Sequence, residues 1–393
     1  MMFDVCIVGT GPGGLQSAVL LSERGVRPLV LEKRKRVTDS FCGELVGKKV
    51  LTLAKIPESS ELVTNRILRT TVINLDTGHS IDIPEKTTGD AYLLDENKFQ
   101  TYLKDVAESN GAEFRFAERA SSVIKRDGFV RGIRTTRVAY NTPITIGADG
   151  ARSTVASTSH FPLSDFKTMP SFRFKLENCK GLDVSCAHFY LSKKIGLGYL
   201  WLYPRSEREC NVGIGSPFPN QMGLILRKFI DKKAEFASAK IIDRNGDRIP
   251  YTGLLPKFVD NGVALVGNSA GQVSNLLGGG VETTLTGATL ASRVVMNALE
   301  SQDYSARQLA SYEKEYKRNY AGKKVQTSAK HLSGIIEFSK KRDVFGYLDE
   351  IFSIVSVAKI TKTVYGEFSI FFILSLMVKH PKFVLKLLID YYL

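Results

Sequence analysis

The sequence has few of the residues that build metal centres or disulfide frameworks. Its 393 residues include five cysteines and five histidines, with no C-x-x-C pair and no metal-ligand spacing between the two types. An odd cysteine count argues against a complete disulfide framework. It leaves open a pair between Cys179 and Cys186, although free thiols are the favoured interpretation. We therefore expect no bound metal and a reducing compartment.

Long apolar runs are also missing. The most apolar stretch, residues 368–378, is too short to cross a bilayer. A first strand that begins at Phe3 predicts that no signal peptide is present. No internal repeat or low-complexity segment appears, and an apolar fraction of 43% is enough for a substantial core. These features predict a soluble, cytoplasmic protein.

The sequence has fewer acidic than basic residues. The chain carries 54 Lys and Arg against 40 Asp and Glu, which gives a formal net charge of +14. Such an excess predicts anionic partners. The basic residues are mixed with acidic ones and no DNA- or RNA-binding motif accompanies them, which argues against nucleic acid. A phosphorylated substrate or peripheral contact with an anionic membrane surface fits this distribution better.

The sequence does contain a glycine-rich loop near its start. The stretch "FDVCIVGTGPGGLQSAVLLSERGVRPLVLEK" (residues 3–33) has the pattern of strand, turn, helix and strand. Gly9, Gly11 and Gly14 have G-x-G-x-x-G spacing, which permits a tight turn, the approach of a pyrophosphate and close packing of helix on strand. Glu32 ends the second strand, where a carboxylate can accept hydrogen bonds from a ribose. The stretch predicts dinucleotide binding at a helix N-terminus.

The remainder alternates between Rossmann-like and sheet-rich stretches. Residues 113–148 and 170–215 are typical of strands, a helix is expected from Asp95 to Gly111, and the chain after Tyr304 is expected to be helical. This predicts a mixed α/β fold in which an antiparallel-sheet domain interrupts a Rossmann-type domain. The predicted boundaries are 1–61, 95–165 and 250–300 for the dinucleotide domain, 62–94 and 166–249 for the substrate domain, and 301–393 for a C-terminal helical region.

Three separated motifs resemble the FAD-binding monooxygenase-like fold in their order and spacing. They are "GTGPGG", "GADGARS" (Gly147–Ser153) and "LVGNSAG" (Leu265–Gly271). The segment "GYLWLYPRSERECNVGIG" resembles the Y-x-W-x-F-P … N-V-G signature of the geranylgeranyl reductase family, and "FCGELV" resembles its C-G-E motif. The ending "MVKHPKFVLKLLIDYYL" is similar to the helical tail of archaeal members. The resemblance covers nearly the whole chain.

The resemblance implies an FAD-dependent reductase of isoprenoid double bonds, such as those of archaeal membrane ether lipids. Carried onto matching positions, the cofactor-binding residues are Gly9, Gly11, Gly13 and Gly14 at the diphosphate, Glu32 at the adenosine ribose, Ala120 at the adenine, Cys42, Gly43 and Leu45 along the flavin, Asn268 at the ribityl chain, and Gly280 and Val281 at the isoalloxazine ring. The glycine run 278–280 permits close backbone approach, and the helix after it directs its N-terminus at the charge of reduced flavin.

The sequence departs from the family pattern at several positions. Asn268 stands where the family usually has Asp, and keeps a carbonyl acceptor without the charge. Glu96 stands where the family has Arg, and near a diphosphate its charge would repel. Leu276 replaces a proline and Ser206 a glycine. Because of Glu96 and Asn268, a prenyl-lipid-binding protein that is poor in flavin is one alternative function.

The implied reaction needs a proton as well as a hydride, because an isolated prenyl double bond is electron-rich. Cys42 is the candidate catalytic proton donor, and a small thiol that merely packs is the alternative. Tyr199, Trp201 and Tyr203 alternate along a strand and so share one face. They are the candidate substrate-binding residues of a lipid channel, and an ordinary half-buried sheet face is the alternative. No second G-x-G-x-x-G marks a nicotinamide site, so ferredoxin and NAD(P)H remain open as electron donor.

Three further interpretations stay open. An FAD-dependent hydroxylase or halogenase of a small molecule is a rival function, but Tyr199 departs from the W-x-W-x-I-P motif of halogenases. The segment 342–393 combines apolar helical faces with lysines, and predicts a helical cap over the channel, an anchor on an anionic membrane, or both. His188 and His331 have no partner pattern and are interpreted as structural or exposed.

Overall fold

The computed structural model describes residues 3–37, 43–84, 90–218, 221–274 and 279–354. The chain divides into two compact units. Unit 1 consists of residues 1–63, 94–168 and 248–326, and unit 2 of residues 64–93, 169–247 and 327–393. The predictions for Cys42, Gly278 and the tail beyond residue 354 lie outside the described residues. Within the described part, no helix is both long and apolar enough to cross a membrane.

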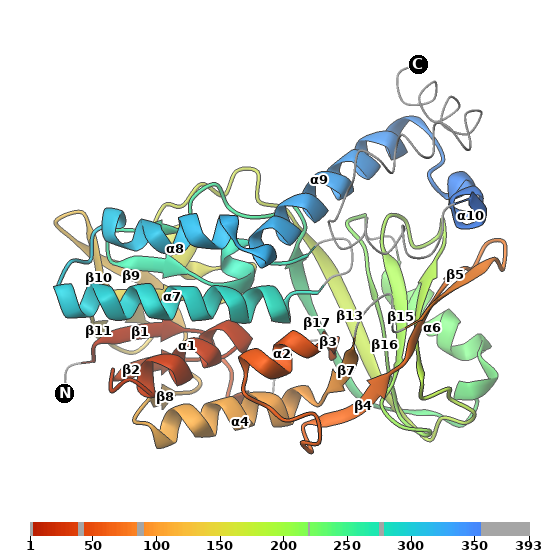
Figure 1. Ribbon diagram of the computed structural model, residues 1–393, viewed down its shortest axis with the longest axis horizontal. Coiled ribbons are helices and arrows are strands. Elements are labelled where there is room, and N and C mark those ends of the chain that lie inside the picture. Colours follow the sequence, from red (N-terminus) through yellow and green to blue (C-terminus); the bar gives the residue numbers. More distant parts are fainter. Residues whose placement is uncertain (1–2, 38–42, 85–89, 219–220, 275–278, 355–393) are drawn as a thin grey trace. The chain divides into compact units, whose positions relative to one another are not determined.

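Unit 1 is built on a six-stranded sheet in the order β18-β19-β12-β1-β2-β8 (Figure 1). All neighbours pair in parallel except β18 with β19. The four central strands are short apolar runs that are buried on both faces, as a parallel sheet covered by helices requires. The strands are β1 (Val5–Val8), β2 (Pro28–Leu31), β8 (Glu113–Arg115), β12 (Ile144–Gly147), β18 (Val259–Asp260) and β19 (Val263–Leu265).

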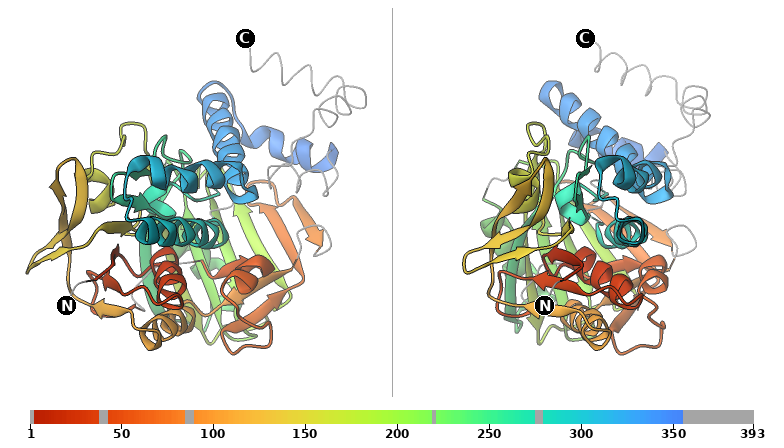
Figure 2. Two further views of the ribbon diagram at one scale, coloured as in Figure 1. Left: turned by 60° about the vertical axis from the view of Figure 1, so that its left-hand side comes forward. Right: turned by 90° about the vertical axis from the view of Figure 1, so that its left-hand side faces the viewer.

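Helix α1 (Pro12–Ser22) packs against both α4 (Glu96–Ser109) and α7 (Val281–Ser301), and α7 runs beside α8 (Ala306–Arg318) (Figures 1 and 2). The start of α4 follows the sequence prediction, because the Asp95 side chain accepts a hydrogen bond from the Lys98 N–H. Gly111, with a φ of +96°, lies just beyond its end. Smaller elements of unit 1 are β3 (Leu45–Gly47), α2 (Lys48–Leu53), β9 (Ala120–Arg126), β10 (Phe129–Thr135), β11 (Ala139–Asn141), α5 (Thr154–Thr158) and the 3₁₀ turn η3 (Gly267–Ala270).

Unit 2 is built on a seven-stranded sheet in the order β17-β13-β16-β15-β14-β5-β6. Strand β13 pairs antiparallel with β16, β16 with β15, β15 with β14, and β5 with β6, whereas β14 pairs in parallel with β5. The strands are β5 (Arg69–Asn74), β6 (Ser80–Pro84), β13 (Thr168–Glu177), β14 (Cys186–Leu191), β15 (Tyr199–Pro204), β16 (Cys210–Gly215) and β17 (Lys240–Pro250). The chain also forms β4 (Val63–Ile67), β7 (Ala91–Leu94), the 3₁₀ turn η2 (Ala234–Phe236), α9 (Tyr320–Lys341) and α10 (Phe345–Ile354).

One face of the unit 2 sheet forms the core with α6 (Met222–Lys232). Leu200 and Leu202 of β15 belong to this core, together with Leu226 and Ile230 of α6. Because side chains alternate along a strand, the odd-numbered residues of β15 point to the other face. No individual helix or strand is predicted from the sequence for residues 216–259, where α6 and β17 lie.

The four described cysteines are free and buried. The Sγ atom of Cys179 lies 3.7 Å from that of Cys210, whereas Cys186 contacts the hydroxyl of Thr71. A Cys179–Cys186 pair is therefore wrong, because β13 and β16 bring Cys179 to Cys210 instead. No group of three or more metal-ligating side chains gathers among the residues of known placement.

Candidate cofactor and substrate sites

The glycines of the first loop have two different surroundings. A Cβ atom on Gly9 would overlap the carbonyl oxygen of Ala148, and one on Gly14 would overlap the carbonyl oxygen of Gly9. A Cβ on Gly13 would lie 2.8 Å from the Thr284 methyl group. Gly11 has no neighbouring atom within 4 Å of its Cβ position. Three glycines thus allow the backbone to pack closely, and Gly11 leaves open space beside the helix.

The first turn of α1 is open to an anion. Gly11 is its N-cap residue and offers no side-chain hydrogen bond, and Pro12 occupies the first helical position. The N–H groups of the next residues therefore receive no capping side chain. An uncapped N-terminus beside an open glycine suits a diphosphate, which carries negative charge and many acceptor oxygens.

Glu32 is fixed at the end of β2 by three hydrogen bonds. Its Oε2 accepts from the Thr10 N–H at 3.0 Å and from the Thr10 hydroxyl at 2.7 Å. Its Oε1 accepts from the Arg34 N–H at 2.8 Å, and the side chain is buried. Each carboxylate oxygen can accept further bonds, so Glu32 is pre-positioned for a ribose. The sequence did not point to Thr10 as its partner.

The segment that leads to Ala120 is bonded to Glu32. The Glu118 N–H donates to the Glu32 carbonyl at 2.8 Å, and Ala120 begins β9 two residues later, with its side chain buried. The two residues that the sequence assigned to the adenosine end of the cofactor therefore belong to segments that one backbone hydrogen bond joins.

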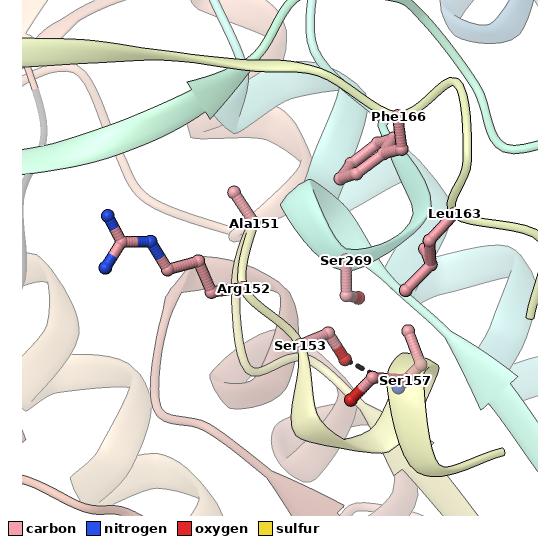
Figure 3. A pocket seen from close by; sticks show the side chains of 8 residues that line it. Ala151, Arg152, Ser153, Ser157, Leu163, Phe166 and Ser269 are labelled. Carbon is pink, nitrogen blue, oxygen red and sulfur yellow. Dashed lines mark hydrogen bonds between the residues drawn. The ribbon is translucent and has the colours of Figure 1, made fainter. Parts of the chain in front are cut away.

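The GADGARS motif stabilises its own turn. Asp149 accepts hydrogen bonds from the Ser153 hydroxyl, the Thr154 N–H and the Val155 N–H. Burial raises the pKa of the Asp149 carboxyl, and these three bonds oppose that shift. The motif also borders a cavity of about 260 Å³ (Figure 3), which Ser269 and Phe166 face while the Arg152 guanidinium extends away. The Ser269 hydroxyl donates to protein carbonyls.

The third motif and the start of α7 converge. Asn268 lies in η3, and its Oδ1 is 3.9 Å from the Cβ position of Gly280. Gly280 is the N-cap residue of α7, has no capping side chain, and is followed by Val281 at the first helical position. The structure thus gathers Asn268, Gly280 and Val281 at a second uncapped helix N-terminus.

The C-G-E motif lies beside Glu96. Gly43 and Leu45 are half-buried, and Glu44 between them is buried with a φ of +71°, a strained conformation for a non-glycine residue. The Glu96 N–H donates to Glu44 Oε1 at 3.5 Å, and Glu96 Oε1 accepts from the Gln100 amide at 3.3 Å. Glu96 is also buried. The sequence gives no sign of this proximity, because the two glutamates are 52 residues apart.

Aromatic side chains cover part of the second face of the unit 2 sheet. The Trp201 ring lies 6.0 Å from the rings of both Tyr199 and Tyr203, which confirms that the three share one face. Phe189 of β14 packs edge-on against Tyr199 at 5.2 Å and Tyr203 at 5.6 Å. We call these four residues the aromatic row. Phe189 was missed, although the alternation along β14 was a signal for it.

The N-V-G part of the tryptophan motif holds the indole. Trp201 Nε1 donates to Asn211 Oδ1 at 2.9 Å, and the Trp201 side chain is 5% exposed. A Cβ on Gly213, which faces Trp201 across β15 and β16, would overlap the indole ring. Asn211 thus orients Trp201 and Gly213 makes room for it.

His188 and His331, the two histidines considered in the sequence, are both partly buried. His188 lies on β14 beside Tyr190, a residue of the α6 core, with ring centroids 6.0 Å apart. Burial lowers the pKa of His188, and Lys233 lowers it further. Burial also lowers the pKa of His331.

The two open helix N-termini, the free space at Gly11 and the fixed Glu32 carboxylate fit the diphosphate, ribose and flavin ring of FAD. Together with the interrupted Rossmann-type sheet, they define an FAD-dependent flavoprotein. Residues 2–191 match the FAD binding domain, and residues 168–248 match the geranylgeranyl reductase catalytic domain.

Named relatives agree with both domains. The chain is 30% identical over 349 residues to the digeranylgeranylglycerophospholipid reductase of Methanocella arvoryzae, covering 83% of the chain and 87% of that protein. It is 30% identical over 337 residues to the Methanosarcina acetivorans protein of the same name, covering 80% and 81%. The chain belongs to the geranylgeranyl reductase family, and it is an FAD-dependent oxidoreductase.

Solved structures show the same fold. A geranylgeranyl bacteriochlorophyll reductase-like protein from Thermoplasma acidophilum aligns with a TM-score of 0.83 at 25% identity, over 99% of each chain. A flavin-dependent brominase aligns with a TM-score of 0.70 at 16% identity, over 93% of this chain and 94% of that one. The second likeness extends to the fold alone.

Proposed function

We propose that this protein saturates carbon–carbon double bonds of geranylgeranyl chains in a membrane ether phospholipid, with FAD as cofactor. The observation that carries the proposal is the aromatic row, of which Trp201 and Tyr203 are buried and Tyr199, Trp201 and Tyr203 lie in the segment that matches the geranylgeranyl reductase catalytic domain. The curated relatives are reductases of digeranylgeranylglycerophospholipid, which supports this substrate class.

FAD is held without a covalent bond in this proposal. Gly9, Gly11, Gly13, Gly14 and the α1 N-terminus take the diphosphate, Glu32 takes the adenosine ribose, Ala120 meets the adenine, Asn268 meets the ribityl chain, and Gly280 and Val281 direct N–H groups at the isoalloxazine ring. Cys42, Gly43 and Leu45 lie along the flavin. No covalent attachment motif is present in the sequence, so denaturation should release all flavin.

The cofactor and the protein supply different parts of the reaction. Bound FAD, once the electron donor has reduced it, would supply the hydride for the double bond. The chain supplies a proton, for which Cys42 is the proposed donor, and it holds the double bond in place while excluding water. The electron donor that reduces the enzyme is ferredoxin or NAD(P)H, and the enzyme acts at the surface of an anionic membrane, in keeping with its net charge of +14.

Substrate binding rests on apolar contact, because a prenyl chain offers little to hydrogen-bond. Burial of apolar area contributes about 25 cal/mol per Å². Trp201 has the largest ring of the aromatic row, and its Nε1–H donates to Asn211 Oδ1 at 2.9 Å. The indole therefore presents a rigid surface to the prenyl chain of the substrate. Its polar Nε1–H is already bonded to the protein, and a hydrocarbon next to it leaves no donor unsatisfied.

The test is an anaerobic assay. Purified protein is checked for bound flavin, reduced with dithionite, and mixed with a geranylgeranyl lipid, and mass spectrometry detects products heavier by two hydrogens per reduced bond. Trp201→Ala should reduce turnover far more than flavin content. Phe218→Ala, which removes a half-exposed ring outside the aromatic row, is the matched control and should retain both.

Three outcomes contradict the proposal. Purified protein that takes up no FAD favours the lipid-binding alternative. Protein that adds no hydrogen to any prenyl lipid but hydroxylates or halogenates a small molecule favours the hydroxylase or halogenase alternative. Unchanged turnover in Trp201→Ala removes the aromatic row from the substrate path.

A further inference from the structure

The loop that carries Asn268 is held from behind by a buried polar network. Gln272 is fully buried, and its Oε1 accepts from the Gly267 N–H at 2.7 Å. Its Nε2 donates to the Tyr312 hydroxyl at 2.7 Å, and that hydroxyl donates to the Leu265 carbonyl at 2.9 Å. The Gln272 amide and the Tyr312 hydroxyl therefore join Leu265 and Gly267, which precede Asn268, to Gln272, which follows it.

The same network reaches the start of α7. The Thr283 hydroxyl, in the first turn of α7, donates to the Gln272 carbonyl at 2.6 Å. Gly287, one turn further along α7, lets this helix pack directly on Gln272, since a Cβ there would overlap the Gln272 side-chain oxygen. Gln272 thus touches both elements that converge on the proposed flavin ring, namely the Asn268 loop and the N-terminus of α7.

Tyr312 belongs to none of the sequence motifs. It lies on α8, 40 residues from Gln272, and its side chain is fully buried. Burial raises the pKa of Tyr312, so its hydroxyl remains a proton donor throughout the physiological range. Removing this hydroxyl would leave the Gln272 amide and the Leu265 carbonyl buried with one bond fewer each, and the loop would shift to recover them.

We propose that Gln272 and Tyr312 are positioning residues that fix Asn268 and the N-terminus of α7 against the flavin ring, and so set how tightly FAD binds and how easily it is reduced. The inference rests on the proposed function only in placing the flavin ring at Asn268 and Gly280. Neither side chain is proposed to touch the cofactor. Their effect is transmitted through the Gly267–Asn268 backbone and the first turn of α7.

The chain provides a control bond that involves neither the Asn268 loop nor α7. Thr142 is buried just before β12, and its hydroxyl donates to the Ile144 carbonyl at 3.1 Å. Thr142→Val removes this buried hydroxyl hydrogen bond to a backbone carbonyl and keeps the size of the side chain. Both Tyr312→Phe and Thr142→Val should lower the melting temperature of apo-protein. Only Tyr312→Phe should weaken FAD binding, by about tenfold, and shift the midpoint potential of bound FAD.

A double-variant comparison tests whether the pair acts as one unit. Gln272→Met removes both hydrogen bonds of the amide at similar volume. Adding Tyr312→Phe to it should weaken FAD binding by less than Tyr312→Phe does alone, because the shared contact is already lost and only the bond to the Leu265 carbonyl remains to be removed. If Gln272→Met does not fold, the comparison of Tyr312→Phe with Thr142→Val tests the proposal by itself.

Two results would overturn the inference. Equal FAD affinity and equal midpoint potential in Tyr312→Phe and Thr142→Val would mean that the network only stabilises the fold. Additive losses in the double variant would mean that Gln272 and Tyr312 act separately. Failure of the proposed function gives a different pattern, in which wild-type protein binds FAD but saturates no prenyl lipid, and the difference between Tyr312→Phe and Thr142→Val still holds.

Discussion

Gly11 of unit 1 and Gly213 of unit 2 serve opposite purposes. In unit 1, the Cβ position of Gly11 is free of protein atoms within 4 Å, so the missing side chain leaves room for a ligand. In unit 2, the Cβ position of Gly213 is filled by the indole of Trp201, so the missing side chain leaves room for the protein itself. The site at Gly11 is therefore made of backbone groups around a space. The site at Gly213 is made of the side chains of the aromatic row, packed onto the backbone.

This difference predicts how each unit responds to substitution. A site made of backbone donors depends on main-chain conformation, and a single added methyl group can close it. A site made of side chains depends on the rotamers of a few large rings, which their neighbours hold in place. FAD binding and prenyl turnover should therefore be separable by variants that belong to only one unit.

The largest expected effect separates two glycines of the same loop. Gly14→Ala should destabilise the folded protein by about 3 kcal/mol, because its methyl group would overlap the Gly9 carbonyl. Gly11→Ala meets no protein atom, so apo-protein should melt within about 2 °C of wild type while FAD affinity falls by at least about tenfold. Thermal denaturation of apo-protein and FAD titration measure the two quantities. Normal FAD binding by Gly11→Ala would remove the diphosphate from this loop.

The next effect belongs to unit 2 alone. Gly213→Ala should displace the Trp201 ring and reduce prenyl turnover by about tenfold or more, while FAD content stays at the wild-type level. Gly215→Ala is the matched control on the same strand and face, since its Cβ would lie an ordinary 3.4 Å from the Ser171 hydroxyl. Tryptophan fluorescence reports the displacement directly, because Trp201 is the only tryptophan in the chain. Equal turnover in the two variants would contradict the role given to Trp201.

A smaller effect concerns Glu96. Glu96→Arg should tighten FAD binding by about tenfold, because the family pattern implies a cation beside the diphosphate at this position, and replacing a like charge there is a change of about 1 kcal/mol or more. Glu44 Oε1 lies 3.5 Å from the Glu96 backbone nitrogen, so a second acidic side chain stands beside the substituted position. Titration of apo-protein with FAD measures the change, and Glu96→Gln should fall between the two. Weaker binding by the arginine variant would place Glu96 away from the diphosphate.

The smallest effect is a pH dependence confined to unit 2. Burial lowers the pKa of folded His188 below the ordinary value of 6.5, so the folded protein favours the neutral ring. Its contribution to stability is therefore complete above pH 6.5 and is lost as the pH falls through the folded pKa. Between neutral and acidic pH, the free energy of unfolding should fall by a few tenths of a kcal/mol less in His188→Gln than in the wild type. Denaturant unfolding between neutral and acidic pH measures this slope, and unchanged slopes would mean that His188 titrates alike in both states.

The sequence alone determined the features that depend on neighbours along the chain. The strand, glycine turn, helix and strand of residues 3–33 lie within a single stretch, and so do the alternating rings of β15 and the Asp95 cap of α4. Each follows from local geometry, because backbone conformation and the two-residue period of a strand act over a few residues. The flavoprotein fold and the family followed from these motifs and their order.

The tertiary structure alone decided which distant residues became partners. Strand pairing brought Phe189 into the aromatic row and Cys179 beside Cys210 rather than Cys186. Helix packing brought Tyr312 to Gln272 across 40 residues, and Glu96 to Glu44 across 52. The alternation along β14 indicates the face on which Phe189 lies but not its ring partners, and the other contacts leave no periodic or compositional trace. A hydrogen bond or ring contact between distant segments is set by strand order and helix docking. Strand order and helix docking arise from the burial of the whole core and not from any one segment.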